Sequence, residues 1–110
     1  MPNEIARVRV TATRWVSDEP IPGVVEVLLQ DADGKIWQFV DKAPMFDDAF
    51  LLVRDSVYPV DFEIECTVLG RRIRDGRPVV EISTAHPWGL EAVDGTFQFE
   101  VAATQVRDSD

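Results

Sequence analysis

Apolar and polar side chains alternate strictly along several segments of the chain. Residues 96–101 read Thr-Phe-Gln-Phe-Glu-Val, and residues 61–68 read Asp-Phe-Glu-Ile-Glu-Cys-Thr-Val. Successive side chains of a β-strand point to opposite faces, so this period of two predicts strands with one buried face and one solvated face. The pattern is typical of an antiparallel sheet that curls over its own core.

The alternation and its interruptions predict six strands. They cover residues 5–16, 24–30, 35–41, 60–73, 78–84 and 96–106. Gly34 and Gly76 close two predicted tight turns, Asp31-Ala32-Asp33-Gly34 and Asp75-Gly76, because glycine adopts positive φ without steric cost. In the first strand the valines at 8 and 10 point inward, so Trp15 falls on the outer face with Arg7 and Arg9.

The Asp75-Gly76 turn also fixes a register for the strands on either side. Residues equidistant from a two-residue turn face each other, which places Arg74 opposite Arg77 and Arg72 opposite Val79. Two opposed arginines repel, so we expect them to find a carboxylate, either Glu81 or one from a neighbouring strand.

Residues 42–59 carry the weakest pattern. A connection of this length without secondary structure is unusual in a compact domain. Asp47 or Asp48 is a candidate cap for a short helix that places Phe46, Phe50 and Val53 on one face. The competing interpretation makes residues 50–53 a strand, and the helix is favoured.

Three strands, a crossover and further strands are the element order of a small open barrel such as the five-stranded OB-fold. We therefore predict an all-β protein with one short helix, folded as a small antiparallel OB-like barrel of about six strands. A two-sheet β-sandwich is the alternative. The length of 110 residues suits a single domain spanning residues 1–110.

Composition narrows the class of protein. The chain has 20 acidic and 11 basic residues, a formal net charge of −9, and one cysteine, which excludes an intramolecular disulfide. No apolar run reaches the length of a membrane span. The first residues, Met1-Pro2-Asn3-Glu4, lack the basic and apolar regions of a signal peptide, so a cytoplasmic location is expected.

Three short stretches carry a resemblance. The run from Trp37 to Phe46, together with Pro87-Trp88-Gly89 and Asp94-Gly95, resembles small bacterial single-domain proteins without an assigned function. The resemblance covers a minority of the chain. It implies a free-standing bacterial domain and brings no catalytic residues with it.

Residues able to carry catalysis are sparse. Cys66 shares its strand face with Ile64 and Val68, and a buried thiol without basic neighbours is inert, so a Cys66–His86 dyad is disfavoured. The turn starting at Asp31 fails the spacing of a calcium-binding loop. One histidine and one cysteine do not make a zinc site, and the glycines are isolated at or near turns. We expect no enzyme activity, no metal and no cofactor.

Aromatic residues and arginines are the best candidates for a binding site, because Trp, Tyr and Arg are the usual anchors of binding surfaces. The alternative for the tryptophans is that they fill the ends of the barrel. The candidate site residues are Trp15, Trp37, Trp88, Arg7, Arg9, Arg71, Arg72 and Arg74.

The leading hypothesis is a non-enzymatic acidic domain that binds another protein, with a basic partner favoured, in the manner of a small inhibitor or immunity-type protein. A monomer and a homodimer are both compatible with the sequence. The first alternative is an OB-type single-strand nucleic-acid binder, which the net charge disfavours because a phosphate backbone is repelled. A small-molecule pocket inside the barrel is the second alternative.

Overall fold

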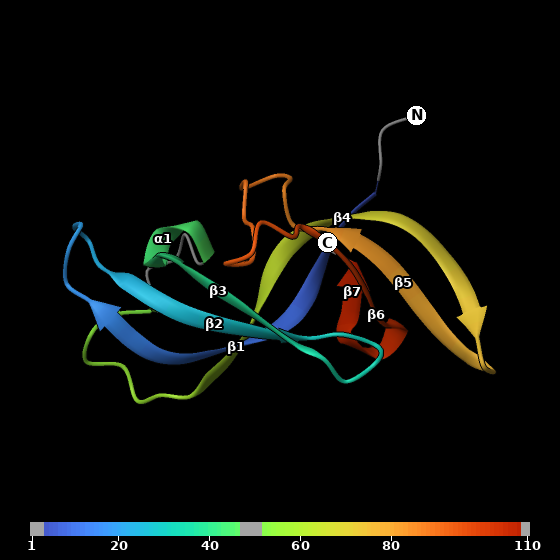
Figure 1. The fold of residues 1–110 in the computed structure, drawn as a ribbon, viewed down its shortest axis with the longest axis horizontal. Coiled ribbons are helices and arrows are strands. Elements are labelled where there is room, and N and C mark those ends of the chain that lie inside the picture. The colour runs from blue at the N-terminus through green and yellow to red at the C-terminus, as the bar shows by residue number, and fades with distance from the viewer. Residues whose placement is uncertain (1–3, 47–51, 109–110) are drawn as a thin grey trace.

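The computed structural model describes residues 4–46 and 52–108. Strands dominate it, and the single α-helix in the described part is one turn long (Figure 1). The elements in chain order are β1 (Glu4–Ser17), β2 (Val24–Gln30), β3 (Ile36–Lys42), α1 (Ala43–Phe46), β4 (Val60–Arg74), β5 (Arg77–Ser83), β6 (Gln98–Ala102), the 3-10 helix η1 (Ala103–Gln105) and β7 (Val106–Asp108). The prediction of an all-β protein with a short helix is confirmed.

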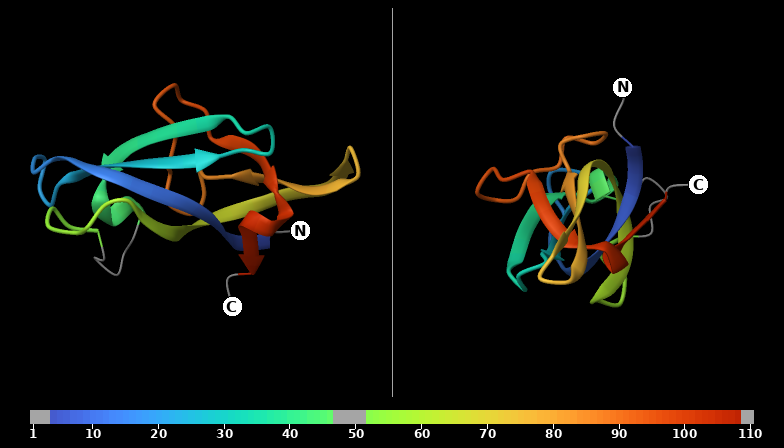
Figure 2. Two further views of the ribbon diagram at one scale, coloured as in Figure 1. Left: turned by 90° about the horizontal axis from the view of Figure 1, so that it is seen from below. Right: turned by 90° about the vertical axis from the view of Figure 1, so that its right-hand side faces the viewer.

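All strands belong to one antiparallel sheet, ordered β3-β2-β1-β4-β5-β6, with β7 added on β1. The sheet curls into a half-barrel, so that its two outer strands approach each other (Figure 2). The gap is bridged by Val93 N–H donating to Gln38 O at 2.9 Å and by Ala32 N–H donating to Glu100 O at 2.8 Å. The small barrel is therefore the observed architecture, and the two-sheet sandwich is not.

The core follows the predicted alternation. The inward residues of β1 and β2 are fully or almost fully buried: Ala6, Val8, Val10, Ala12, Val25, Val27 and Leu29. Phe39 on β3 lies at the centre, with its ring centroid 5.7 Å from that of Phe99 and 6.5 Å from that of Phe46. These edge-on and tilted ring contacts join β3, β6 and α1 into one apolar cluster.

The hairpin between β4 and β5 forms as the sequence predicts. Asp75 and Gly76 both have positive φ, 52° and 78°, which is the geometry of the turn that matches strand twist. Arg74 lies opposite Arg77 and Arg72 lies opposite Val79. The first half of β4 pairs with β1 and the second half with β5, so the hairpin extends past the barrel as an arm (Figure 1).

The last predicted strand, residues 96–106, is interrupted. The chain pairs with β5 only over β6, turns through η1 and then pairs with β1 as β7. Gln105 explains the break: its side-chain oxygen accepts the Ala102 N–H at 3.0 Å, and its amide donates to Gln30 O at 2.8 Å. Local side-chain bonds to the backbone compete with a strand ladder in this way, and alternation alone does not reveal them.

The short helix lies earlier than predicted. It spans Ala43–Phe46 and includes Pro44, which the first turn of a helix tolerates because its N–H would have no partner there. The predicted caps and Phe50 fall in 47–51, outside the described residues. Val53 belongs to neither a helix nor a strand, so both interpretations of residues 50–53 are wrong at that position.

Trp15 lies on the opposite face from the one predicted. Ala12 pairs with Val27 but Arg14 pairs with Glu26, so Thr13 is an extra residue in the ladder, and a second shift follows Trp15. A β-bulge of this kind changes the face on which the following side chains lie. Trp15 consequently pairs with Val25, whose side chain is buried, and packs against the core.

Candidate functional site

Three of the predicted arginines are held by carboxylates of this chain. Arg72 and Arg74 both bind the carboxylate of Glu100 on β6, at 2.7 and 2.6 Å, and Arg74 also binds Asp33 at 2.7 Å. Arg71 binds Glu4 at 2.7 Å. The prediction that the opposed arginines Arg74 and Arg77 find a carboxylate is confirmed for Arg74, which binds Glu100 of the neighbouring strand β6. Arg77 has no ion pair with a described carboxylate. Hydrogen bonds and charges from Arg72 and Arg74, those of Arg72 first, lower the pKa of Glu100.

Arg7 and Arg9 lie elsewhere on the sheet. They pair with Glu65 and Glu63 across the first half of β4, whereas the other three arginines belong to the arm that β4 forms with β5. Glu63 in turn binds Arg107 of β7 at 2.6 Å. The outer face of β1 and β4 is therefore a surface of interleaved positive and negative groups.

Trp37 closes the barrel between its two outer strands. Its ring lies edge-on to Phe99 with centroids 5.1 Å apart, and Lys35 Nζ lies 3.9 Å from the ring centroid. Its indole N–H donates to Asp31 Oδ2 at 2.8 Å, while the other oxygen of Asp31 accepts the N–H groups of Asp33 and Lys35. Both the ring and the indole N–H of Trp37 are thus engaged within this chain.

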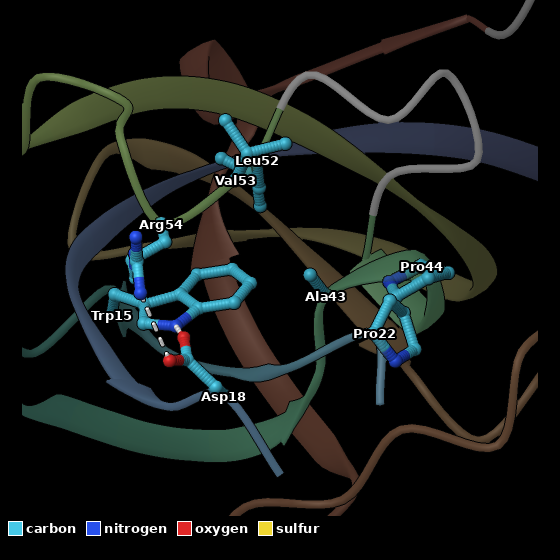
Figure 3. A pocket seen from close by; sticks show the side chains of 8 residues that line it. All are labelled: Trp15, Asp18, Pro22, Ala43, Pro44, Leu52, Val53 and Arg54. Atoms are coloured by element: carbon cyan, nitrogen blue, oxygen red, sulfur yellow. Dashed lines mark hydrogen bonds and ion pairs between the residues drawn. The ribbon is translucent and has the colours of Figure 1, made fainter. Parts of the chain in front are cut away.

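Trp15 forms one wall of a pocket of about 270 Å³ (Figure 3). Its indole N–H donates to Asp18 Oδ1 at 2.8 Å, and the second oxygen of Asp18 accepts a hydrogen bond from Arg54 at 3.2 Å. In Figure 3 the six-membered ring of Trp15 points toward the space between Leu52 and Ala43. The pocket is lined by Trp15, Asp18, Pro22, Ala43, Pro44, Leu52, Val53 and Arg54.

Trp88 lies in the loop of residues 84–97 between β5 and β6, which we call the Trp88 loop. Two of its residues anchor it: Leu90 is fully buried and Ala92 is buried. The hydroxyl of Thr84, itself fully buried, donates to Leu90 O at 2.8 Å, and Leu90 N–H donates to Thr84 O at 3.0 Å. The Trp88 loop is therefore held by its own backbone and by the core.

The residues between these anchors point outward. Trp88 is 43% exposed, Val93 is 62% exposed and Glu91 is exposed. Trp88 also borders a narrow crevice of about 40 Å³ with Arg7 and Glu65, so two of the predicted site residues are brought together there. Trp15 lines the separate pocket of about 270 Å³, and Trp37 packs against Phe99, so neither borders this crevice.

The Trp88 loop is acidic. Residues 84–97 contain two carboxylates, Glu91 and Asp94, and no lysine or arginine. Asp94 accepts the N–H of Thr96 at 3.0 Å, and that hydrogen bond is the main cause that lowers the pKa of the Asp94 carboxyl. Glu91 and Asp94 therefore place two negative charges beside an exposed tryptophan and an exposed valine.

The only cysteine and the only histidine do not form a reactive pair. Cys66 is fully buried, and burial raises the pKa of its thiol to about 12. His86 is exposed in the Trp88 loop, where its backbone carbonyl accepts a hydrogen bond from Thr67 at 3.2 Å. Within residues 4–46 and 52–108, no cluster of three or more metal-ligating side chains occurs. No helix in this part of the chain is long and apolar enough to cross a membrane.

Comparison with protein-family models, with curated proteins and with solved structures finds no match for this chain. The function must therefore be inferred from the molecule itself.

Sequence reasoning named Trp88 but missed the surface around it. Leu90, Glu91 and Ala92 follow the apolar–polar alternation that marked the strands, but Val93 is apolar and breaks it, so its exposure required the fold. That pattern was available in the sequence and indicates anchored and outward positions within an irregular segment. The pocket beside Trp15 had no such signal, because it depends on two bulges in β1.

Proposed function

We propose that this protein is a non-enzymatic acidic domain that binds a basic protein through the Trp88 loop. The observation that carries the proposal is an exposed tryptophan, held on an ordered loop that also carries the carboxylates of Glu91 and Asp94. Trp is a frequent anchor of protein interfaces, and charge complementarity selects the partner and speeds association. An inhibitor or immunity-type protein that masks a basic partner has this chemistry.

The order within the loop supports a role in binding. Ordering a loop on association costs free energy, and a loop that is already ordered avoids that cost. Here the Thr84–Leu90 bonds, the bond from Val93 to Gln38 and the buried Leu90 hold the loop before any partner arrives. Trp88 and Val93 can therefore be buried by a partner without refolding.

The ion pairs within the chain support an acidic rather than a basic contact surface. A nucleic-acid groove would use the five candidate arginines Arg7, Arg9, Arg71, Arg72 and Arg74. Three of them, Arg71, Arg72 and Arg74, already bind Glu4, Glu100 and Asp33. A phosphate backbone would have to displace these carboxylates and overcome a net charge of −9. The order of β1 to β5 resembles an OB-type barrel, but element order does not carry function. The cytoplasmic location stays a prediction.

Affinity capture from a lysate of the native host tests the proposal. Wild-type protein should retain one stoichiometric basic partner, and Trp88→Ala should weaken the complex about 30-fold or more, as for an anchor worth about 2 kcal/mol. Replacing Glu91 and Asp94 by Gln and Asn should slow association and reduce its dependence on salt.

Ile21→Ala is the matched control. Ile21 is 82% exposed, more than Trp88, but lies in the loop between β1 and β2, so its loss should leave binding unchanged. The proposal is wrong if the lysate yields no partner and the protein remains a monomer at every salt concentration. It is also wrong if Ile21→Ala and Trp88→Ala weaken binding equally.

A further inference from the structure

The pocket beside Trp15 is built by an unusual local backbone. A register shift at Thr13 turns the Trp15 side chain from the outer face toward the core, and a second shift follows at Val16. β-Bulges occur often next to functional sites because they re-aim a side chain. The indole then packs on the backbone of Gly23, where an added Cβ would lie 1.9 Å from a ring carbon of Trp15.

The walls and the rim of the pocket differ in chemistry. Its walls are the Trp15 ring, two prolines and the apolar side chains of Ala43, Leu52 and Val53. Its rim has one carboxylate, Asp18, and one guanidinium, Arg54 (Figure 3). Pockets with apolar walls and a few placed polar groups are the usual form of small-molecule sites.

We propose that this pocket binds a small apolar amino acid in its zwitterionic form. The apolar side chain would lie against Trp15, the ammonium group would meet Asp18, and the carboxylate would meet Arg54. The volume of about 270 Å³ is slightly below the range of drug-sized pockets, which suits a ligand of this size. The two rim groups have opposite charges, so a ligand with both charges satisfies both.

The rim groups are available for a ligand. The Asp18–Arg54 contact is a single one of 3.2 Å between side chains that are 59% and 65% exposed, and such surface pairs contribute little to stability. Arg54 also lies 3.8 Å from Asp55, which is more exposed still. The Trp15 N–H fixes the position of Asp18 and is the main cause that lowers the pKa of its carboxyl, so Asp18 is ionised at neutral pH.

A nuclear magnetic resonance titration of the full chain with L-leucine tests the proposal. Leucine is added to about 20 mM, which detects a dissociation constant of about 1 mM. The expected result is a saturable shift of the Trp15 indole N–H and of the backbone amides of Gly23 and Arg54. Leucinamide, which lacks the carboxylate, and 4-methylpentanoate, which lacks the ammonium group, should each bind about tenfold more weakly.

Two variants test which charged group of the ligand each rim residue binds. Arg54→Met should weaken leucine binding about tenfold but leave leucinamide unaffected, and Asp18→Asn should weaken leucine but leave 4-methylpentanoate unaffected. Arg14→Met is the control, since Arg14 is a similarly exposed arginine that pairs with Glu26 outside the pocket. These positions are exposed, so the variants are expected to fold.

Absence of saturable shifts, equal binding of all three compounds, or equal effects of Arg14→Met and Arg54→Met would each overturn the proposal. The pocket proposal does not rest on the Trp88 loop. Trp88→Ala, which tests that loop, should leave the leucine titration unchanged, so the two proposals fail separately.

Discussion

At the residue scale, the contact between Trp15 and Gly23 shows how one small residue fixes a large one. Gly23 is buried, has a φ of +129° and lies directly under the indole ring. Its carbonyl accepts the N–H of Ala43 at 3.0 Å, which ties the loop before β2 to the start of α1. The position therefore requires both the backbone freedom and the small size of glycine.

Gly23→Ala is expected to destabilise the protein by about 3 kcal/mol. The new methyl group would collide with Trp15, and alanine is strained at this φ, so packing and backbone costs add. Urea unfolding followed by tryptophan fluorescence measures the change. Gly70→Ala is the control, because nothing lies within 4 Å of its added Cβ, and it should change stability by less than about 0.5 kcal/mol. Equal stability of the two variants would contradict this account of Gly23.

Cys66 gives a second prediction at the same scale. The thiol is fully buried on β4 and its pKa is raised to about 12, chiefly because burial disfavours the thiolate. At pH 8 a thiol reagent such as Ellman's reagent should label the folded protein at least about a hundredfold more slowly than the urea-unfolded chain. Rapid labelling of the native protein would show that this part of β4 is open to solvent.

At the element scale, Glu100 is the common partner of two arginines on the arm. It lies on β6, accepts hydrogen bonds from Arg72 and Arg74, and is opposite Glu81 in the β5–β6 ladder. The two guanidinium groups offset the repulsion between the neighbouring carboxylates. The arm formed by β4 and β5 is thus joined to β6 by charge as well as by the backbone ladder.

Glu100→Gln is expected to lower the stability at pH 7 and to flatten its fall in acid. Hydrogen bonds and charges from Arg72 and then Arg74 lower the pKa of Glu100 below its ordinary value of 4.5. As the pH falls, the Glu100 carboxylate takes up a proton in the unfolded chain before it does so in the folded protein. The stabilisation that Glu100 provides is therefore fully present above about pH 4.5 and is lost as the pH falls through the lower pKa of the folded state. The pKa of Glu26 is lowered as well, mainly because its carboxylate accepts a hydrogen bond from Thr13.

Urea midpoints measured between about pH 3 and pH 7 check this prediction. The wild-type midpoint should fall more steeply in acid than that of Glu100→Gln. Glu91→Gln is the control, since Glu91 lies exposed in the Trp88 loop without an ion pair among the described residues. Parallel profiles for wild type and Glu100→Gln would mean that the arginine contacts do not stabilise the fold.

The elements themselves were largely predictable from alternation, and the exceptions have local causes. β2 matches its prediction at both ends, and the turn at Asp75-Gly76 fixes its hairpin register correctly. The end of the chain departs from prediction because the Gln105 side chain bonds to Ala102 and Gln30. Alternation assumes one residue per ladder position, so it cannot reveal bulges or side-chain bonds to the backbone.

The candidate site was also predictable only in part, because its residues depend on the strand register as well as on long-range contacts. The need of Arg74 for a carboxylate followed from its place opposite Arg77 in the hairpin register, although the identity of Glu100 required the fold. Trp88 was identified as a loop residue correctly. Trp15 was assigned to the outer face because the extra residue at Thr13 leaves no mark in the sequence.

At the scale of the whole molecule, ion pairs within the chain neutralise many of its arginines. The carboxylates left over therefore determine how the protein's charge acts on a partner. Among the described residues, six arginines form ion pairs with carboxylates: Arg14, Arg54, Arg71, Arg72, Arg74 and Arg107. The chain has 11 basic residues in all, so the pairing involves more than half of its positive charge. The surplus carboxylates set the long-range field, which attracts cations and repels polyanions.

A fluorescence anisotropy titration with a labelled single-stranded oligonucleotide tests this balance. At about 20 mM salt, where screening is weak, the wild-type protein is expected not to bind the oligonucleotide, because the arm arginines are paired and the net charge is −9.

A labelled lysine-rich peptide should bind under the same conditions and should be released at about 0.5 M salt. Glu100→Gln removes the carboxylate partner of Arg72 and one of the two partners of Arg74, which keeps Asp33. The net charge changes by only one unit, so any oligonucleotide binding that the variant gains would come chiefly from Arg72. Tight binding of the oligonucleotide by wild-type protein, weakening steeply with salt, would contradict the acidic-surface account and favour single-stranded nucleic acid as the partner.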